Sequence, residues 1–587
     1  MSPDSHLPGP PMRNLTDMEF YTASGSPSPW TAFGQAPHIQ HEVYSDGSVG
    51  RLKEWLDSCE QDHELCRFSG HEYQPKRLLA IRLCTHQPTV CGHLTTLLTC
   101  GWGRRPDTEA TDPDGVFQVQ LVETVPGRRY HYAALSHIWA ETNPLRTTAS
   151  TMHRHQQPMS VHELPDAFRD AAILTLLLGL DYIWIDSLCI VQDDASDWNE
   201  HAPQMYSIYS GAEFVIAAHG PDLGMVKPPP EPIHDKQRPG DPPIFYREST
   251  SDLHASFFSN PKDTSSWFGR AWCMQERIFA RRVVHFGGGV SEEIVLECNT
   301  TITCECGGLP NQDKGAGSGG SQTLKAEMVA DLMPFTLTLS AVSESSLDEL
   351  WKFYVKACEN YTARGLTYGT DTLPAVSSLM GKLRPYLGDY YAGLWQYNLL
   401  LGLQWEALDT RKSSRHAKYV APTFSWTSRS GAVIWYADPG IKPSESIHDF
   451  ARVISVRCLT STEDPCGSVI AGSITLRGHV TTTMTIADTQ MHAPDGRVRL
   501  VKDGTPPCFV IFDSREDYEG LEAGAAVVCL DVMRDKSDKE NDSNYVSGLV
   551  LVPLELPDSG EVYKRVGFST MRVKHFSDAV VEEVTIV

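Results

Sequence analysis

The feature that most constrains this chain is a helix with almost no polar face, followed at once by a short apolar strand. Residues 165–178 read PDAFRDAAILTLLL, and Gly179 directly after them suits the left-handed residue that ends many helices. The apolar strand YIWID follows at residues 182–186. A helix this apolar must be buried, and a buried helix beside an apolar strand is typical of a parallel sheet covered by helices. The chain is therefore expected to contain an α/β domain.

The alternation of strands and helices continues on both sides of this pair. Residues 130–139 and 213–218 are strand-like. Residues 197–209 are helix-like, and Pro203 inside them predicts a kink or a late start. A helix at about 271–280 leads into a further strand that ends at Phe286. Repeated alternation of this kind favours an open, mostly parallel sheet.

The remainder of the chain has a different character. Residues 325–410 read as helical, and from about 450 onward short alternating strands predominate. We predict these parts: a disordered leader at 1–40, an N-terminal flank at 41–129, an α/β domain at 130–306 with an insertion at 226–243, a linker or insertion at 307–322, a helical region at 323–445 and a β-rich C-terminal region at 446–587.

Charge and hydropathy exclude several classes of protein. With 50 Lys and Arg against 74 Asp and Glu, the formal charge is −24, which argues against a nucleic-acid partner. The most apolar stretch, residues 171–180, is half as long as the roughly 20 residues that a membrane-spanning helix needs, so no membrane partner is expected. The N-terminus has an acid at position 4 and no apolar run behind it, so we expect a cytoplasmic protein.

The cysteines leave a choice between metal binding and simple packing. Their number, 15, is odd, which in a cytosolic protein indicates free thiols or metal ligands before disulfides. Three stretches of the chain contain closely spaced cysteines, but none of them has the C-x2-C pairs that zinc sites favour. We therefore predict no metal site and prefer packing as small hydrophobic side chains, with structural zinc as the alternative. The groups are Cys59-x3-His63-x2-Cys66, Cys84-x-His86-x4-Cys91-x-His93 and Cys298-x5-Cys304-x-Cys306.

Two kinds of catalytic motif can be weighed from the residues alone. Cys189 follows one predicted strand, His137 ends another, and Asp186 could orient the histidine, so a nucleophilic thiol is conceivable at the carboxyl ends of the strands. A cysteine inside the apolar run at 188–191 is more often buried and inert. No glycine-rich phosphate loop follows a strand, so Rossmann and P-loop interpretations have little support.

Three unusual motifs occur in order along the chain. The first is YAALSHIWA at residues 132–140, and the second extends over residues 164–193 and contains YIWIDSLCIVQD. The third is R-x-W-x-x-Q-E-x-x-x-x-R, whose positions here are Arg270, Trp272, Gln275, Glu276 and Arg281. With these motifs the sequence resembles the heterokaryon incompatibility (HET) domain family, found chiefly in filamentous fungi. A weaker likeness extends to the flanks at 55–66, 366–375, 393–395 and 422–426.

The resemblance implies a role in non-self recognition and programmed cell death. HET domains are also similar to TIR domains, flavodoxin-like modules of which some cleave NAD+ with a helix-borne glutamate, and residues 272–276 look like the W-C-x-x-E of that helix. By this resemblance Glu276 is the catalytic carboxylate, with Asp186 and Ser136 positioning the ribose. The residues expected to bind the substrate are Trp139, Arg270, Trp272 and His137. NAD+ is the candidate substrate, and the sequence identifies no certain cofactor.

Other interpretations stay open beside this one. Glu276 could instead pair structurally with a neighbouring arginine, and the tryptophans could be core residues. The chain could be a non-catalytic signalling module that self-associates or binds a protein partner, or a HET-like fold recruited to small-molecule biosynthesis. Arg277, Arg281 and Arg282 lie close to Glu276 in the sequence, so a locally basic cleft could hold a small phosphorylated ligand.

Overall fold

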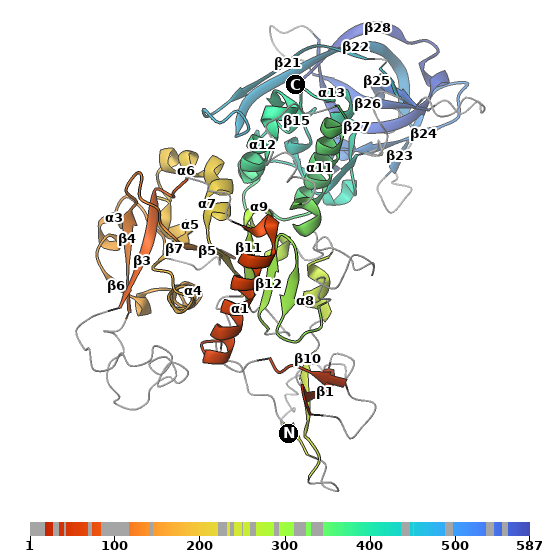
Figure 1. Cartoon of the computed structure of the whole chain (residues 1–587). Coiled ribbons are helices and arrows are strands. Elements are labelled where there is room, and N and C mark those ends of the chain that lie inside the picture. The colour runs from red at the N-terminus through yellow and green to blue at the C-terminus, as the bar shows by residue number, and fades with distance from the viewer. Residues whose placement is uncertain are drawn as a thin grey trace, which may run out of the picture. The chain divides into compact units, whose positions relative to one another are not determined.

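The chain divides into two compact units, each discontinuous in sequence (Figure 1). The first unit comprises Met1–Cys189, Gly211–Ser259 and Ala280–Ala326, and the second comprises Ile190–Ser210, Asn260–Phe279 and Glu327–Val587. The predicted domain boundaries stay predictions. The computed structural model describes residues 18–26, 34–39, 43–67, 73–83, 117–139, 145–220, 232–234, 240–248, 251–258, 266–286, 293–309, 325–329, 344–435, 447–449, 451–487, 497–535, 545–554 and 561–587.

The first unit is built on a nine-stranded mixed sheet. Its four central strands, β11, β8, β5 and β7, are mutually parallel, and the strands outside them pair antiparallel. In order across the sheet the strands are β13 (Ile302–Cys304), β12 (Val295–Cys298), β11 (Arg282–Phe286), β8 (Val215–Ala218), β5 (Ala133–His137), β7 (Tyr182–Ile185), β3 (Arg77–Leu83), β4 (Phe117–Glu123) and β6 (Met159–Ser160).

The fold is therefore mixed α/β, with parallel pairing only among the four central strands, and the expected open TIR- or flavodoxin-like sheet is not confirmed. A parallel neighbour needs a crossover of about a dozen residues or more, usually through a helix. β12 begins too soon after β11 for such a crossover, so it turns back antiparallel. The flank supplies β3 and β4 as a second antiparallel pair beside β7.

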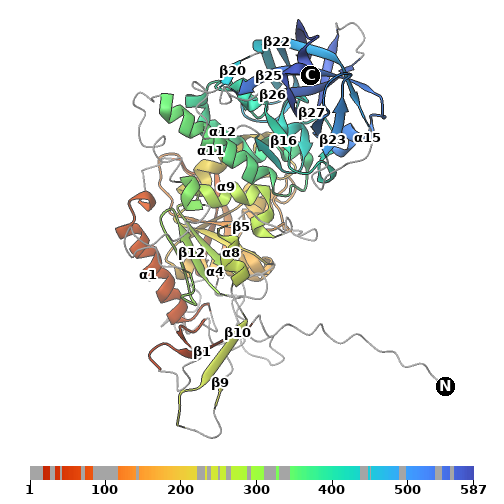
Figure 2. The ribbon, with the colours of Figure 1, turned by 90° about the vertical axis from the view of Figure 1, so that its right-hand side faces the viewer.

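The helices of the first unit cover both faces of the sheet. α4 (Asp166–Leu177) is buried along most of its length and contacts β5 and β7, which confirms the predicted apolar helix. α1 (Asp46–Asp62), capped by Ser45, contacts β12 and lies on the opposite side of the sheet in Figure 2. The shorter helices are η2 (Glu64–Cys66), α3 (Met152–His155), η4 (Val161–Glu163), α5 (Asp186–Cys189) and α8 (Ser251–Ser256). A separate small sheet contains β2 (Gly34–Ala36), β1 (Met18–Ala23), β10 (Ile244–Glu248) and β9 (Pro232–Ile233).

The predicted helix at 197–209 is present and is interrupted at Pro203. It consists of α6 (Ala195–His201), the 3-10 turn η5 (Ala202–Gln204) and α7 (Met205–Gly211). Asp194 caps α6 by accepting hydrogen bonds from the backbone N–H groups of Ser196 and Asp197. Since proline lacks an N–H group, the regular helix stops there and resumes one turn later.

The second unit continues with helices and then small sheets. α12 (Pro374–Leu387) packs against α9 (Ala271–Phe279), α11 (Glu344–Thr362) and η5. The remaining elements before the C-terminal sheet are η6 (Trp267–Gly269), η7 (Gly369–Asp371), α13 (Leu399–Gly402), η8 (Thr410–Lys412), η9 (Trp426–Ser428), and the strand pairs β14 (Tyr390–Tyr391) with β15 (Leu394–Trp395), β16 (Trp405–Ala407) with β19 (Val433–Trp435), and β17 (Ser414–Arg415) with β18 (Arg429–Ser430).

The β-rich C-terminal region forms one sheet that closes on itself. β22, β23, β24, β27, β26 and β25 pair in sequence, and a further pairing of β25 with β22 completes a ring of antiparallel strands, here called the C-terminal ring. A cluster of buried apolar side chains fills it. The elements are β20 (Ile447–Asp449), β21 (Arg452–Thr460), β22 (Val469–Ile486), β23 (Arg497–Val501), β24 (Cys508–Phe512), α15 (Arg515–Glu519), β25 (Ala526–Asp535), β26 (Tyr545–Leu554), β27 (Val562–Arg572), η10 (Val573–Phe576) and β28 (Val580–Ile586). Of the helices described, none is both long and apolar enough to cross a membrane.

Candidate functional site

Three of the predicted site residues meet at the carboxyl ends of β5 and β7 in the first unit. The indole Nε1 of Trp139 donates a hydrogen bond of 2.8 Å to Oδ2 of Asp186. Nδ1 of His137 lies 3.8 Å from Oδ1 of the same carboxylate. The parallel register, which pairs Leu135 with Ile185, places the residues that follow each strand at the same edge of the sheet. We call Trp139, His137 and Asp186 the edge cluster.

The carboxylate of the edge cluster has a fixed orientation and partial access to solvent. Its Oδ1 accepts a 2.7 Å hydrogen bond from the backbone N–H of Ser187, at the start of α5. His137 packs edge-on against Phe168 of α4, with ring centroids 4.8 Å apart. The Asp186 side chain is 23% exposed, while Trp139 is 38% exposed. The cluster can thus accept hydrogen bonds from hydroxyl groups and offer an aromatic face to a ligand.

Ser136 is positioned differently from its neighbour. It is buried in β5, and it pairs across the sheet with Ala217 of β8. Because successive side chains in a strand point to opposite faces, Ser136 and His137 project to opposite sides of the sheet. A role for Ser136 in binding a ribose stays a prediction.

Glu276 lies on α9 in the second unit. Trp272 and Glu276, four residues apart and both half-buried, share one side of this helix. Gln275 is buried, and its side chain hydrogen-bonds the carbonyl of Ala375 and the hydroxyl of Ser378 on α12. These bonds fix the rotation of α9 about its axis, and with it the side on which Trp272 and Glu276 lie.

Asp371 is a residue near Trp272 that sequence reasoning did not select. The indole Nε1 of Trp272 donates a 3.3 Å hydrogen bond to Oδ2 of Asp371, and Trp198 of α6 packs edge-on against Trp272 with centroids 6.4 Å apart. Burial raises the pKa of Asp371. A carboxyl group whose pKa is raised is a candidate for proton transfer. The only sequence signal was its place in the flank that resembles the family, at residues 366–375.

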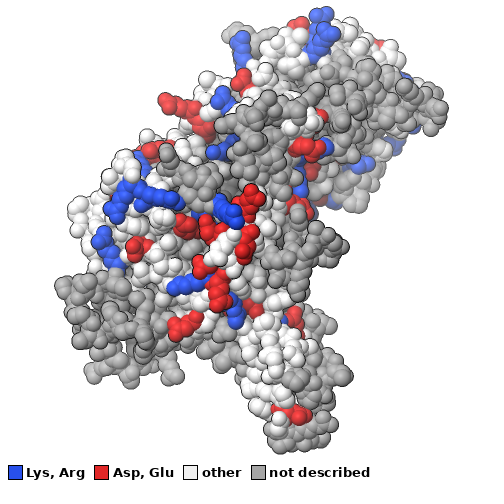
Figure 3. Space-filling model, viewed as in Figure 1, with Lys and Arg blue, Asp and Glu red and all other residues white. Residues whose placement is uncertain are grey.

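The predicted basic cleft is not an open surface, which corrects that expectation. Arg277, Arg281 and Arg282 are 2%, 7% and 4% exposed. Arg277 packs over the ring of Phe268 in the second unit, whereas Arg281 and Arg282 pair with Glu213 and Glu60 in the first. Figure 3 shows acidic and basic side chains interspersed on the visible face. Arg270 is half-buried, and its backbone bridges Gly365.

Cys189 does not have the environment of a nucleophile. It is fully buried, and burial raises the pKa of its thiol to about 12. A thiol reacts as the thiolate, so this cysteine is inert near neutral pH. We therefore expect no alkylation of Cys189 by iodoacetamide at pH 8 in the folded protein, and full alkylation after denaturation. Peptide mass spectrometry of both samples checks this, and rapid modification of the folded chain would restore the thiol hypothesis.

The structure brings together two groups of potential metal ligands in the first unit. In each group the ligand atoms all lie within 4.8 Å of one another. The first group, the α1–β12 cluster, consists of Cys59, His63, Cys66 and Cys298, and the second of His254, Glu293, Cys304 and Cys306. Sequence reasoning had treated Cys298 with Cys304 and Cys306. The motif at Cys84, His86, Cys91 and His93 lies outside the described residues.

The second group has an internal explanation that needs no metal. Nε2 of His254 lies 2.6 Å from Oε1 of Glu293, and the sulfur atoms of Cys304 and Cys306 are 3.3 Å apart. Burial lowers the pKa of His254, but its contacts with Cys306 and Glu293 outweigh burial and raise the pKa to about 9. An ion pair between His254 and Glu293 therefore accounts for the contact of these two side chains.

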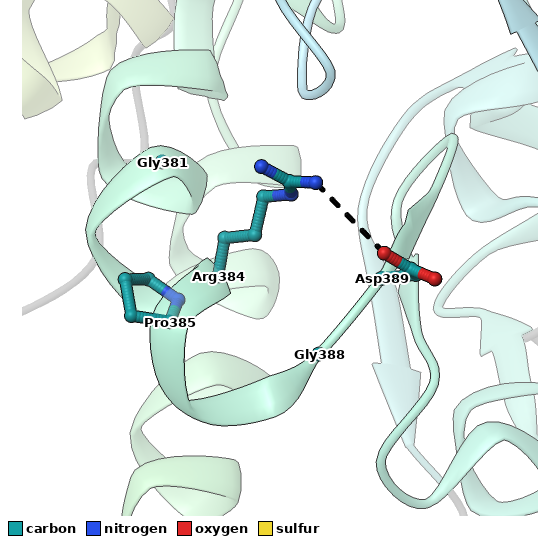
Figure 4. A pocket seen from close by; sticks show the side chains of 5 residues that line it. All are labelled: Gly381, Arg384, Pro385, Gly388 and Asp389. Carbon is teal, nitrogen blue, oxygen red and sulfur yellow. Dashed lines mark ion pairs between the residues drawn. The ribbon is translucent and has the colours of Figure 1, made fainter.

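A surface hollow lies at the C-terminal end of α12 (Figure 4). It is lined by Gly381, Arg384, Pro385, Gly388 and Asp389, and a guanidinium nitrogen of Arg384 lies 3.8 Å from Oδ1 of Asp389. The hollow is shallow and open, and none of the predicted site residues lines it. Its chemistry, one weak and exposed ion pair, gives no reason to place a reaction there.

Comparison with known families agrees with the resemblance that the three sequence motifs indicate. Residues 132–276 match the model of the family described as heterokaryon incompatibility protein (HET), which confirms the resemblance over that range. The matched residues include the edge cluster and Glu276, and they are distributed over both units. No curated protein and no solved structure matches the chain.

Proposed function

We propose that this chain acts in non-self recognition and the cell-death response, as the HET match suggests, and that it does so by cleaving NAD+ with Glu276 as the catalytic carboxylate. The proposed chemistry is supported by the position of Trp272 and Glu276 on the same side of α9. There a half-buried tryptophan, Trp272, lies one helical turn before Glu276. The aromatic side chain can pack against a base or sugar of the substrate. The carboxylate can place its negative charge beside the ribose.

The chemistry suits a carboxylate. The bond between the ribose and the nicotinamide nitrogen breaks, its electron pair leaves with nicotinamide, and the ribose gains oxocarbenium character. A water molecule then adds to the ribose carbon and loses a proton, which yields ADP-ribose. A carboxylate beside the ribose offsets the positive charge that develops in the transition state, and such electrostatic stabilisation is commonly the largest catalytic effect. Arg270 and Trp272, which lie in the second unit with Glu276, are proposed to assist in binding the substrate. Binding of sugar hydroxyl groups by Asp186, Trp139, His137 and Ser136 stays a prediction.

The test is nicotinamide release by the full-length protein. Wild type is incubated with NAD+ both dilute and clustered on a multivalent scaffold, and nicotinamide is followed by chromatography. We expect Glu276→Gln to lower kcat by about 10²–10³-fold, because the amide keeps the shape of the side chain and removes its charge. Glu349→Gln is the matched control, since Glu349 is an exposed residue of α11 paired with Lys352, and it should keep wild-type activity.

Each outcome decides between the hypotheses. If wild type releases no nicotinamide in either state, the chemical part of the proposal is refuted. If it is silent but assembles into oligomers whose formation tracks the cell response, the non-catalytic signalling module is the better description. If Glu276→Gln retains full activity while the chain cleaves NAD+, Glu276 is not the catalytic residue.

A further inference from the structure

We infer that the α1–β12 cluster, Cys59, His63, Cys66 and Cys298, is a structural zinc site with three thiolate ligands and one imidazole ligand. The four ligand atoms lie within 4.8 Å of one another, so a single ion can reach all of them. Three cysteines and one histidine are one of the common ligand sets of structural zinc.

The distance between a sulfur atom and a nitrogen atom of this cluster fits a tetrahedral site. With Zn–S at about 2.3 Å and Zn–N at about 2.0 Å, tetrahedral angles place a sulfur and a nitrogen ligand about 3.5 Å apart. Sγ of Cys298 lies 3.4 Å from Nδ1 of His63. Nδ1 is also a ring nitrogen through which histidine commonly binds metals.

Simple packing does not explain the composition of this cluster. Cys59, Cys66 and Cys298 are 1%, 0% and 0% exposed and form a buried cluster of their own, which among the described residues has no aliphatic or aromatic member. Cysteines that act as small hydrophobic side chains pack among larger apolar ones. A group made of three thiols beside an imidazole indicates coordination.

Two of the three sulfur atoms accept hydrogen bonds from nearby N–H groups. Backbone N–H groups of Thr300 and Thr301 donate to Sγ of Cys298 over 3.4 and 3.2 Å. Nε of Arg282 donates to Sγ of Cys59 over 3.3 Å. Three thiolates around Zn2+ carry a formal charge of −1, and the buried guanidinium of Arg282, which also pairs with Glu60, places positive charge beside them. Such second-sphere donors orient the ligands and stabilise their charged form.

The ion would join parts of the chain that are far apart in sequence. Cys59 lies in α1, His63 ends that helix, Cys66 ends η2, and Cys298 ends β12. Asn299 already links the same two segments through a 2.9 Å hydrogen bond from its Nδ2 to the carbonyl of Leu65. A bound zinc ion would hold the N-terminal flank against β12 of the nine-stranded sheet, and its binding free energy would contribute to folding.

The zinc content of the purified full-length protein tests the inference. Elemental analysis should find at least one equivalent of zinc per chain in wild type. Cys66→Ser and Cys298→Ser should each hold one equivalent fewer than wild type. Cys458→Ser is the matched control because Cys458 is a partly exposed cysteine of the second unit, and it should keep the wild-type amount. Wild type without zinc, or folded variants with the wild-type amount, would overturn the inference.

A second measurement remains decisive if the serine variants do not fold. In the Cys304→Ser/Cys306→Ser background, cobalt replacing zinc should show thiolate-to-cobalt charge-transfer absorption and the visible bands of a tetrahedral site. His63→Cys should retain the ion with a shifted spectrum, whereas His63→Ala should bind it more weakly. Absence of the charge-transfer bands, or a disulfide between any two of the three cysteines in non-reduced peptides, would contradict the zinc site.

Discussion

Replacing Arg565 by methionine is expected to lower the free energy of unfolding of the C-terminal ring by about 3–5 kcal/mol. Arg565 on β27 and Asp513 after β24 are both completely buried. Nε of the arginine donates to Oδ2 of the aspartate over 3.1 Å. Removal of the guanidinium would leave a buried carboxylate without its main cation, which costs far more than the loss of an exposed ion pair.

The arginine also connects the C-terminal ring to the segment that precedes it in the second unit. Its Nη1 donates to the carbonyl of Leu403 over 2.6 Å, and its Nη2 donates to the carbonyl of Trp405. The guanidinium carbon lies 3.5 Å from the centroid of the Trp405 ring. One side chain therefore satisfies two backbone carbonyls and one carboxylate, and all three lose a partner in the variant.

Hydrogen exchange of peptides from β24 and β27 measures this effect locally, since a chain with two units does not unfold in one step. Arg515→Ala is the control, because Arg515 is exposed and pairs with Glu519 on the surface of α15, so no measurable change is expected. The double variant Arg565→Met/Asp513→Leu should recover part of the stability, because it removes both charges. Equal protection in Arg565→Met and the control would refute the prediction.

The second large effect is expected for Gly393→Ala, which should destabilise the second unit by about 2–5 kcal/mol. Gly393 has φ +105° in the two-residue turn between β14 and β15, where Ala392 also has positive φ. A Cβ atom added at Gly393 would lie 2.9 Å from Nε1 of Trp426 and 3.0 Å from Cγ2 of Thr427. Backbone strain and a steric clash therefore act together.

Gly504→Ala separates these two causes. Gly504 has φ +74°, but nothing lies within 4 Å of a Cβ added there, so this variant measures strain alone and should lose only about 1–2 kcal/mol. Calorimetry of both variants compares the midpoints of the second unit's transition. Equal shifts would mean that Trp426 moves aside at little cost and that the clash has no part in the effect.

The same turn connects two of the segments with weak family likeness that lie outside the matched range. The carbonyl of Gly393 accepts a 2.8 Å hydrogen bond from Nε1 of Trp426, and it also accepts the hydroxyl of Tyr354. The segments at 393–395 and 422–426 therefore form the two sides of one contact. Their contact could not be predicted from spacing, because the residues of one segment carry no sign of the other.

Local patterns predicted local structure well. The apolar stretch at 165–178 became α4, and Pro203 interrupted its helix as expected. The sheet was less predictable, because antiparallel or parallel pairing depends on the length of the connections and on neighbours from the flank. The edge cluster was partly foreseen, since the ends of parallel strands meet, whereas Asp371 had only the weak family likeness of residues 366–375 as a signal.

Side chains close together along the chain were enough to predict several helices and strands, the family match and the candidate residues, but not the strands β3 and β4 of the N-terminal flank. Tertiary structure alone decided that Arg281 and Arg282 are buried partners of glutamates and that Cys298, 235 positions after His63, joins the α1–β12 cluster. Such contacts depend on how a folded chain closes long loops. No periodicity or local spacing records which distant residues meet, because the free energy that selects them comes from burial in the complete fold.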